Sequence, residues 1–562
     1  MIAAMNSHCI DCSTPFTITD TEIQFLQKIA PEFDGKKFPI PLPTSCPDCR
    51  LKRRNVQRNE QCFYHNVSAV TGKPLLSLYS PDTDWGKKYK IYTHEEWWSE
   101  SRDDLEFGRE FDFSRPFFEQ YQELLHDIPY VNLIQVGNEN CPFTTGTGYC
   151  KNCYLINCSE NCENCYYGKL LQTSRDILDS SYVYDSELCY ECFNVRNCYN
   201  CQYLSYSQNC TDCAFSENLR GCRSCFLCTN LNNKEFYFLN EPLTKEEYQK
   251  KVAEFLGSRE GLSKAAELLK GLREKRIYKY ANVINCEAST GDFLSNCKNC
   301  TDCYDVNDSE DSKYVTVGVN VKDILDCSNM YLKPELSYQV LGTIGTYNVH
   351  FSLYIFSSQN VLYSQFCHTS ANLFGCAGLR KKEYCILNKQ YTKEEYEQLM
   401  PRILEHMQKT GEWGQFFPMS MSPFGYNETV AQDYLPMTRE EALAKNYQWK
   451  DPDTKEYKPQ TYRAPTHIRD VKDDILKETL ACEKCGKNYK IILQELRRLR
   501  DISFPVPALC PDCRHVRRMS MRQPRHLYDR ACMKCGVALS TPFSPERPET
   551  VYCEKCYLEV AD

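Results

Sequence analysis

The chain has 562 residues, more than a single hydrophobic core accommodates, and about three to five domains are expected. It is 42% hydrophobic and 25% charged, a composition that excludes a disordered chain. Its formal net charge of -8 excludes a uniformly basic protein, so any surface for nucleic acid must be local.

The cellular context decides how the 36 cysteines are interpreted. No apolar run reaches the roughly 18 residues of a membrane span, so no membrane partner is expected. Met1 to Cys12 lacks the basic and apolar segments of a secretory signal. We therefore expect a cytoplasmic, reducing environment, in which CxxC pairs indicate metal or redox chemistry rather than disulfides.

Two CxxC pairs lie near the start of the chain, formed by Cys9, Cys12, Cys46 and Cys49. Zinc takes four soft ligands in a tetrahedron, and each CxxC turn supplies two thiolates. This spacing predicts a zinc ribbon over residues 1–59. Structural disulfides and a redox dithiol are the less favoured alternatives.

Residues 60–100 resemble a second ribbon that lacks its cysteines. Gly72 and Ser80-Pro81 keep the spacing found in the last module of the chain. The cysteine positions of that module are occupied here by Ser68, Thr71, Thr93 and Glu96. We expect the same fold without metal, with the zinc replaced by packing, for which Trp97 and Trp98 are candidates.

The middle of the chain is repeated. The segment Cys150 to Cys153 recurs as Cys297 to Cys300, and Asp-Ile-Leu-Asp at 176–179 recurs at 323–326. After a helical linker over 101–137, two copies of one domain are therefore expected, at 138–243 and 286–391.

A shorter repeat lies within each copy. Short β-prone segments alternate with Asn, Asp and Ser corners, a pattern typical of the coils of a parallel β-solenoid. We expect each coil to be as long as the shift between two sets of cysteines. The first set is Cys189, Cys192 and Cys201, and it recurs as Cys210, Cys213 and Cys222.

Helical segments follow each predicted copy. Thr244 and Thr392 are predicted N-caps, each with a glutamate three residues later that completes a capping box. We expect a helical insertion over 244–285 and a helical or irregular wrap over 392–480. The aromatic and methionine-rich stretch 411–449 is expected to cover the end of the second copy, with an exposed interaction surface as the alternative.

Three interpretations of the cysteines inside the predicted solenoid stay open. They are small buried hydrophobes stacked in ladders, which is the favoured interpretation. Alternatively, Cys189, Cys192, Cys210 and Cys213 bind a further metal ion. In the third interpretation, thiols on neighbouring coils form a redox relay.

Eight cysteines near the C-terminus form two further sets of CxxC pairs. A zinc ribbon over 481–523 is predicted from Cys482, Cys485, Cys510 and Cys513. A second ribbon over 524–562 is predicted from Cys532, Cys535, Cys553 and Cys556. With the N-terminal site, the expected cofactor is three zinc ions per chain.

A basic run follows each Cys-Pro-Asp-Cys segment. Offsets of 3, 4 and 8 place several of the arginines on one helix face. The residues concerned are Arg50, Arg53, Arg54 and Arg58, and then Arg514, Arg517, Arg518 and Arg522. One interpretation is a local phosphate-binding surface for RNA or another nucleic acid. The alternative is that these arginines pair with acidic faces of the solenoid or of a partner subunit.

No catalytic constellation is apparent, so an enzyme is not expected. The carboxylates of the two Asp-Ile-Leu-Asp segments are three residues apart at an apparent corner, where aspartate is common for turn reasons. His94-Glu95-Glu96 lacks the second histidine of a metalloprotease helix.

The segments Cys46 to Arg54 and Cys510 to Arg518 resemble probable zinc-ribbon, treble-clef-like domains of bacterial proteins. The whole layout, including Ser422 to Thr429, resembles an uncharacterised cysteine-rich family of candidate-phyla bacteria that carries several zinc ribbons. The resemblance covers nearly the full chain and implies ribbons at both ends, but no activity.

These observations predict a mainly β, multidomain protein in which zinc ribbon or treble-clef modules flank a duplicated cysteine-rich parallel β-solenoid with helical insertions. The favoured function is a zinc-binding scaffold that binds RNA or a ribonucleoprotein through its arginine faces. A structural or assembly protein, joined to a protein partner or a second copy, is the first alternative. A thiol redox or metal-storage protein is the second.

Overall fold

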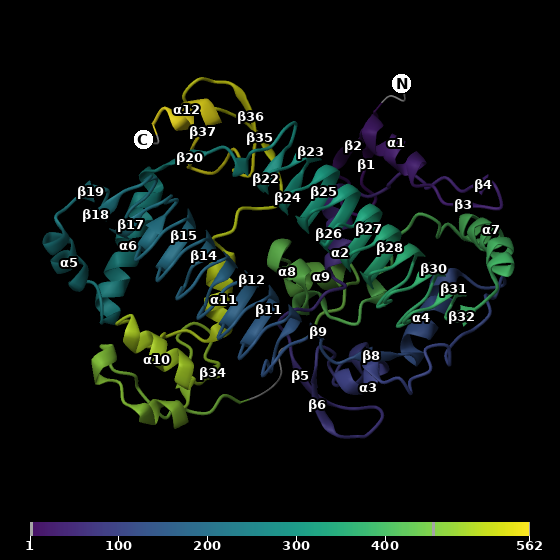
Figure 1. The fold of residues 1–562 in the computed structure, drawn as a ribbon, viewed down its shortest axis with the longest axis horizontal. Helices are drawn as coiled ribbons and strands as arrows, with labels where there is room; N and C mark the ends of the chain where they lie inside the picture. Colours follow the sequence, from purple (N-terminus) through teal and green to yellow (C-terminus); the bar gives the residue numbers. More distant parts are fainter. Residues whose placement is uncertain (1–3, 452–455, 561–562) are drawn as a thin grey trace.

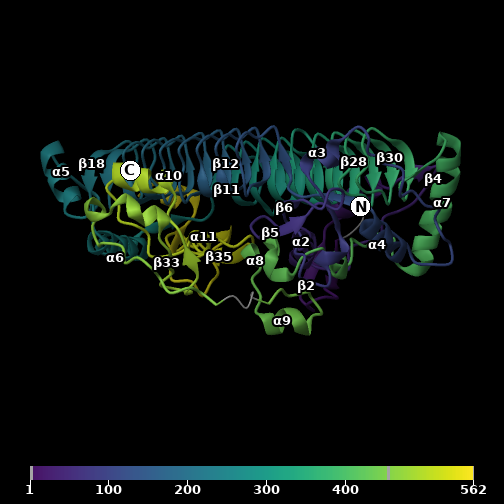
Figure 2. The same ribbon diagram turned by 90° about the horizontal axis from the view of Figure 1, so that it is seen from below.

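Two large, mostly parallel β-sheets form the centre of the molecule, which is described here from a computed structural model covering residues 4–451 and 456–560. The first sheet has eleven strands and the second has twelve. We call them the first stack and the second stack. They lie side by side, and the terminal modules pack along one side of them (Figures 1 and 2). The protein is therefore mainly β, as predicted.

The strands of each stack follow one another in space nearly as they do in the sequence. Those of the first stack are β9 (Gln135–Val136), β10 (Thr145–Gly148), β11 (Tyr154–Glu160), β12 (Tyr166–Gln172), β13 (Ser181–Tyr184), β14 (Phe193–Arg196), β15 (Gln202–Gln208), β16 (Ala214–Glu217), β17 (Arg223–Phe226), β18 (Glu235–Phe238) and β19 (Glu241–Pro242). Those of the second stack are β21 (Val283–Ile284), β22 (Gly291–Ser295), β23 (Lys298–Thr301), β24 (Cys303–Asn307), β25 (Glu310–Val319), β26 (Lys322–Tyr331), β27 (Glu335–Ile344), β28 (Tyr347–Phe356), β29 (Gln359–Leu362), β30 (Ala371–Phe374), β31 (Glu383–Ile386) and β32 (Lys389–Gln390). In each stack the last two strands pair antiparallel.

The register of the parallel pairs corrects the predicted length of each coil. Lys169 lies opposite Ser181, and Ser181 lies opposite Phe193, so each step advances the chain by twelve positions. Most parallel pairs of the second stack have the same step, for example Tyr304 opposite Thr316, whereas Val283 lies opposite Leu294 and Lys322 opposite Glu335. The expected length, the shift from Cys189 to Cys210, was therefore wrong.

The reason is a shorter unit of three residues inside each twelve-residue step. Asn161, Asn164, Tyr167 and Leu170 all have φ between 53° and 56°, and such left-handed residues recur every three positions along the stack. Asparagine and aspartate tolerate this conformation better than other residues with a side chain. The shift from Cys189 to Cys210 is a multiple of three residues but not of twelve. The second cysteine set therefore also faces the interior, but from a different side of the stack.

Helices cover the ends and edges of the stacks. The first stack is followed by α5 (Lys245–Ala253) and α6 (Arg259–Lys275), and the second by α7 (Lys393–Thr410). Thr244 and Thr392 cap α5 and α7 in capping boxes completed by Glu247 and Glu395, as predicted. The linker before the first stack contains α4 (Phe117–Asp127). No helix among the described residues is both long and apolar enough to cross a membrane.

The aromatic stretch after α7 is largely buried. Trp413, Phe416 and Phe417 are each at most 3% exposed and join a hydrophobic cluster with the second stack. The Trp413 indole donates a hydrogen bond to the Pro39 carbonyl at 2.8 Å. This stretch contains η2 (Met419–Met421), η3 (Tyr426–Glu428), α8 (Val430–Tyr434) and α9 (Arg439–Ala444). Trp413, Phe416 and Phe417 thus pack between the N-terminal module and the second stack, and the predicted covering of the end of this stack stays a prediction.

Candidate metal centres and their arginine contacts

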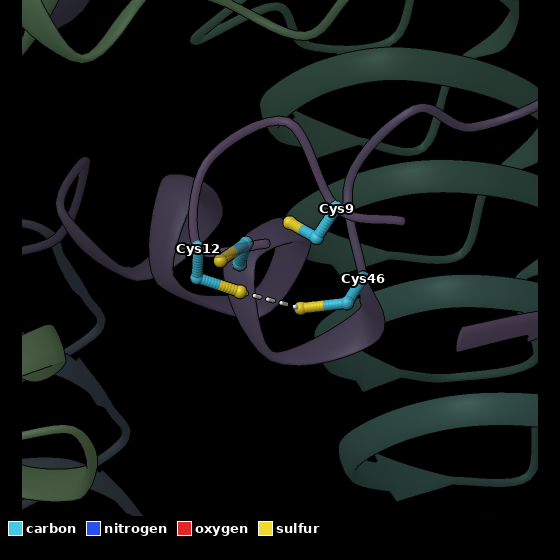
Figure 3. A group of neighbouring side chains, drawn as sticks. Cys9, Cys12 and Cys46 are labelled. Atoms are coloured by element: carbon cyan, nitrogen blue, oxygen red, sulfur yellow. Dashed lines mark hydrogen bonds between the residues drawn. The ribbon is translucent and has the colours of Figure 1, made fainter. Parts of the chain in front are cut away.

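Three groups of four cysteines have sulfur atoms that all lie within 4.8 Å of one another. They are the predicted sets, namely Cys9, Cys12, Cys46 and Cys49, then Cys482, Cys485, Cys510 and Cys513, and then Cys532, Cys535, Cys553 and Cys556. Figure 3 shows Cys9, Cys12 and Cys46 with their sulfur atoms converging.

The spacing of the sulfur atoms fits zinc. Tetrahedral Zn–S bonds of about 2.3 Å place two thiolate sulfurs about 3.8 Å apart. The Cys12–Cys46 and Cys485–Cys510 sulfurs are 3.7 Å apart, and the Cys535–Cys553 sulfurs are 3.8 Å apart. A disulfide requires about 2.05 Å, and all described cysteines are free thiols. The protein thus has three four-cysteine groups suited to hold three zinc ions.

Each centre combines a tight turn with a helix N-terminus. In the first centre the Cys9 N–H donates to the Thr14 carbonyl at 3.0 Å, and the Ser13 N–H donates to the Cys9 carbonyl at 2.8 Å. Cys46 is the N-cap of α2 (Pro47–Asn55), with proline at the first helical position. Cys510 and Cys553 are the N-caps of α11 (Pro511–Met519) and α12 (Glu554–Leu558). A helix N-terminus favours negative charge, which stabilises the thiolate form of the ligands.

Short strands complete the terminal modules. Those around the first centre are β1 (Met5–His8), β2 (Pro15–Ile18), β3 (Glu32–Phe33) and β4 (Lys36–Lys37), with α1 (Asp20–Lys28). Those around the second are β33 (Leu480–Ala481) and β34 (Asn488–Tyr489), with α10 (Leu493–Asp501). Around the third, β35 (Tyr528–Ala531) and β36 (Ala538–Thr541) form a hairpin, and β37 (Thr550–Tyr552) pairs in parallel with β20 (Ile277–Lys279).

The third module has a recognisable relative among protein families. Residues 525–561 match a family model described as a probable treble clef zinc finger. This last module is similar to a treble clef. The match covers the third four-cysteine group and supports zinc as its ion. A comparison of the chain with curated proteins found no match.

The segment predicted to be a ribbon without metal has the elements of this treble clef module. A hairpin of β5 (Tyr64–Val67) and β6 (Pro74–Ser77) precedes β7 (Lys90–Tyr92) and α3 (His94–Trp98). Strand β7 pairs in parallel with β8 (Pro129–Val131), as β37 does with β20. The turn is also shared, because the Gly72 N–H donates to the Ser68 carbonyl at 2.8 Å and the Gly536 N–H donates to the Cys532 carbonyl at 2.8 Å.

Hydrogen bonds join the residues at the four positions that correspond to the cysteines of the last module. The Ser68 hydroxyl donates to both Glu96 oxygens at 2.8 Å, and the Thr71 hydroxyl donates to one of them at 3.2 Å. The Thr93 N–H donates to the other at 2.8 Å. Burial raises the pKa of Glu96, but the hydrogen bonds from Thr93, Ser68 and Thr71 outweigh it and lower the pKa overall. Trp97 packs against His368 of the second stack, with ring centroids 5.4 Å apart, and the packing role expected for the two tryptophans stays a prediction.

We predict that Glu96→Ala destabilises this segment by about 2 kcal/mol, because two hydroxyls and one N–H lose a charged acceptor. Hydrogen exchange of the amides in 64–98 measures the change. Glu95→Ala is the matched control, since its side chain is exposed on the same helix. Equal protection in both variants would show that the Glu96 contacts contribute nothing. A variant with cysteine at 68, 71, 93 and 96 is expected to bind a fourth zinc ion.

The arginines after each Cys-Pro-Asp-Cys segment point into the stacks. Arg50 forms an ion pair with Asp326 at 2.8 Å and lies 3.8 Å from the Glu22 carboxylate. Arg54 lies 3.6 Å from the Asp326 carboxylate. All four side chains are at most 3% exposed. We call this group the N-terminal arginine cluster.

The same arrangement recurs at the other end of the chain. Arg514 forms ion pairs with Asp179 and with Glu495, the latter at 2.7 Å. Arg518 forms an ion pair with Asp179 at 3.1 Å. These four side chains, the C-terminal arginine cluster, are at most 1% exposed. Burial lowers the pKa of Arg514, but Asp179 and Glu495 outweigh it and raise the pKa well above its usual value. The Arg514 guanidinium is thus held charged against the carboxylates of the fold.

The two clusters connect the ends of the chain crosswise. Helix α2 of the N-terminal module packs on the second stack, and α11 of the C-terminal module packs on the first stack (Figure 1). Asp179 and Asp326 are the last residues of the two Asp-Ile-Leu-Asp segments. Their partners are arginines in this structure, which agrees with a structural role for these carboxylates.

The remaining arginines of the predicted nucleic-acid surface also have acidic partners. The ion pairs are Arg53 with Asp11 at 3.0 Å, Arg58 with Glu60, Arg517 with Glu191, and Arg522 with Asp305. Of the eight arginines, Arg517 is the most exposed in these pairs, at 46% of its side chain, followed by Arg53 at 17%. The side chains of the other six are at most 10% exposed and their charges are paired, and a phosphate-binding role for the eight arginines stays a prediction. Six of the eight pair with acidic residues of the stacks, as the alternative expects, whereas Arg53 and Arg58 pair with residues of the N-terminal segments.

The cysteines of the stacks lie in their interior. Apart from Cys62, Cys158 and Cys286, every cysteine outside the three centres is buried. A typical thiol, Cys201, lies 3.4 Å from the Tyr199 carbonyl and 3.6 Å from the Cys210 carbonyl. In the part of the chain that the structure describes, none of them joins a group of three or more ligand atoms within 4.8 Å. Their burial is what the packing interpretation predicts.

Proposed function

We propose that the protein is a zinc-held structural scaffold, in which two β-solenoids derived from one duplicated unit are clamped side by side by zinc modules at the chain ends. The observation that carries the proposal is the pair of buried arginine clusters, one on each stack and built from the same residue types. The shared twelve-residue register and the corresponding capped helices support the duplication. The predicted domain boundaries are compatible with these elements and stay a prediction.

The zinc ions would have a mechanical role in this scaffold. Cys46 and Cys49, at the start of α2, would hold that helix by a metal ion, and Arg50 and Arg54 on the same helix reach the second stack. The four ligands fix the helix in the orientation that inserts both arginines. Since buried guanidinium groups require well-placed partners, the helix must be held rigidly. The proposed function is therefore structural: the protein provides a rigid scaffold whose surfaces bind other molecules.

This proposal differs from the nucleic-acid and redox alternatives in a testable way. We expect about three zinc ions and no iron per chain by elemental mass spectrometry, on protein purified without added metal. We also expect no micromolar binding of a fluorescent single-stranded RNA at about 50 mM salt, because six of the eight arginine side chains are buried and paired with carboxylates. Fluorescence anisotropy measures the binding.

Arg53→Gln and Arg517→Gln provide the control, since these two side chains are the most exposed members of the predicted surface. RNA binding that weakens with salt and is lost in this double variant would overturn the scaffold proposal in favour of nucleic-acid binding. Five or more zinc ions, or stoichiometric iron, would instead favour a metal or redox role for the stack thiols.

A further inference from the structure

A groove of about 640 Å³ runs between α10 and the first stack. This volume lies within the range of small-molecule and oligomer sites, about 300–1,000 Å³. One wall is formed by Gln494, Arg497 and Asp501 of α10. The other is formed by corresponding residues of successive twelve-residue steps, so the groove follows the long axis of the stack.

The floor of the groove is a column of amides and one carboxylate. Asn140, Asn152, Asn164 and Asp176 occupy the same corner in four successive steps, each with φ between 51° and 54°. Successive positions are about 4.8 Å apart. The Asn140 amide donates to Asn152 at 2.9 Å, and the Asn164 amide donates to Asp176 at 3.1 Å. The side-chain N–H groups of Asn152 and the side-chain carbonyl oxygen of Asn164 form no hydrogen bond within residues 4–451 and 456–560, so a donor and an acceptor remain for a ligand.

Two tyrosines form the adjoining side. Tyr154 and Tyr166 lie opposite each other in the register and are half-buried. Tyr154 packs edge-on against Phe143 and Tyr167, which fixes the orientation of its ring. Neither phenol hydroxyl donates a hydrogen bond to another described residue. Both side chains line the groove, and each combines an apolar ring with a polar tip.

The charges of the groove balance. Its charged lining residues are two cations, Arg497 and Arg498, and two anions, Asp176 and Asp501. Arg498 is already committed, because its guanidinium donates to the Leu188 carbonyl and to Asn200. Arg497 is exposed and has no ion pair among the described residues. A groove for single-stranded nucleic acid carries net positive charge, which is not the case here.

We propose that this groove binds a neutral oligosaccharide lying along the axis of the first stack. Sugar rings present apolar faces to tyrosines, and their hydroxyls both donate and accept hydrogen bonds, which suits amides, a carboxylate and a guanidinium. The repeated column suits a chain of repeated units. This inference adds a ligand to the scaffold and does not depend on the clamping role of the zinc modules.

Saturation-transfer NMR with the full chain tests the proposal, using cellotetraose, maltotetraose and chitotetraose at millimolar concentration. We expect at least one of them to bind. Tyr154→Ala is expected to weaken binding by about three- to tenfold, through loss of a stacking face. Arg497→Glu, on the exposed helix surface, is expected to weaken it without affecting folding. Tyr199→Ala, a substitution of an exposed first-stack tyrosine outside the groove, is expected to leave it unchanged.

Three results would overturn the proposal. The first is the absence of saturation transfer to any of the three tetrasaccharides. The second is binding that neither groove variant weakens. The third is salt-sensitive binding of a short single-stranded RNA that Arg497→Glu abolishes, while no sugar binds. The last result would assign the groove to nucleic acid.

Discussion

Asp179→Asn is expected to destabilise the protein by about 3–5 kcal/mol, because it removes the carboxylate that the buried Arg514 and Arg518 share and leaves each with one acidic partner, Glu495 and Glu191 respectively. Breaking a buried ion pair from one side costs more than the pair contributes, since the remaining charge cannot regain water. Urea unfolding followed by tyrosine and tryptophan fluorescence measures the change. We expect the first transition to come from the C-terminal modules.

Asp185→Asn is the matched control for this experiment. Asp185 is also an aspartate at a left-handed corner of the first stack, but its pair with Arg196 is 3.4 Å long and both side chains are 45% exposed. Such a surface pair contributes at most about 1 kcal/mol. Similar losses in the two variants would contradict the assigned role of the C-terminal arginine cluster. A variant that replaces Asp179, Glu495, Arg514 and Arg518 together by apolar residues is expected to regain much of the stability, because it leaves no unpaired charge in the cluster and buried ion groups can often be replaced in this way.

Removal of zinc from the centre at Cys482, Cys485, Cys510 and Cys513 is expected to have a still larger effect. Structural zinc sites contribute about 10–16 kcal/mol of apparent binding free energy at pH 7, and small zinc modules are commonly unfolded without the ion. We expect Cys510→Ser to lower the zinc content by one ion per chain and to release α11 from the first stack. Limited proteolysis with mass spectrometry should then show new cleavage within 481–523, while the stacks stay intact.

Cys201→Ser controls for the loss of a cysteine as such. Ser207 already donates to the carbonyl two residues before it at 2.8 Å, as stack cysteines do, so a hydroxyl is accommodated at an interior position. The Cys201→Ser variant should keep three zinc ions and the parent cleavage pattern. Loss of zinc from Cys201→Ser, or full zinc content in Cys510→Ser, would contradict the assignment of the metal centres.

Local features of this fold could be predicted from the sequence because each depends on a few neighbouring residues. The zinc ligands follow from CxxC spacing, and the helix starts at Thr244 and Thr392 follow from capping boxes. The three-residue unit was also readable, since first-stack cysteines such as Cys150, Cys153, Cys162 and Cys165 differ by multiples of three. The longer repeat of the cysteine sets concealed it, because that repeat is itself a multiple of the same unit.

Long-range partners could not be predicted in the same way. Nothing near Arg50 in the sequence indicates that its partner is Asp326, or that the partner of Arg514 is Asp179. A basic run on a helix face is the same pattern whether the face meets phosphate or a buried carboxylate. The contacts of Glu96 could not be predicted for a similar reason, because they depend on a turn that brings Ser68 and Thr71 to the start of α3.

The crosswise attachment of the chain ends has a consequence for how the protein is made. The C-terminal arginines emerge from the ribosome after Asp179, so their partner is already present. The N-terminal module emerges first, and its arginines must wait for Asp326. At about 5–20 residues per second, the intervening roughly 270 residues take about 15–55 s to synthesise. During that time the N-terminal module depends on its own metal ion for order, and zinc supply during translation should limit the yield of folded protein.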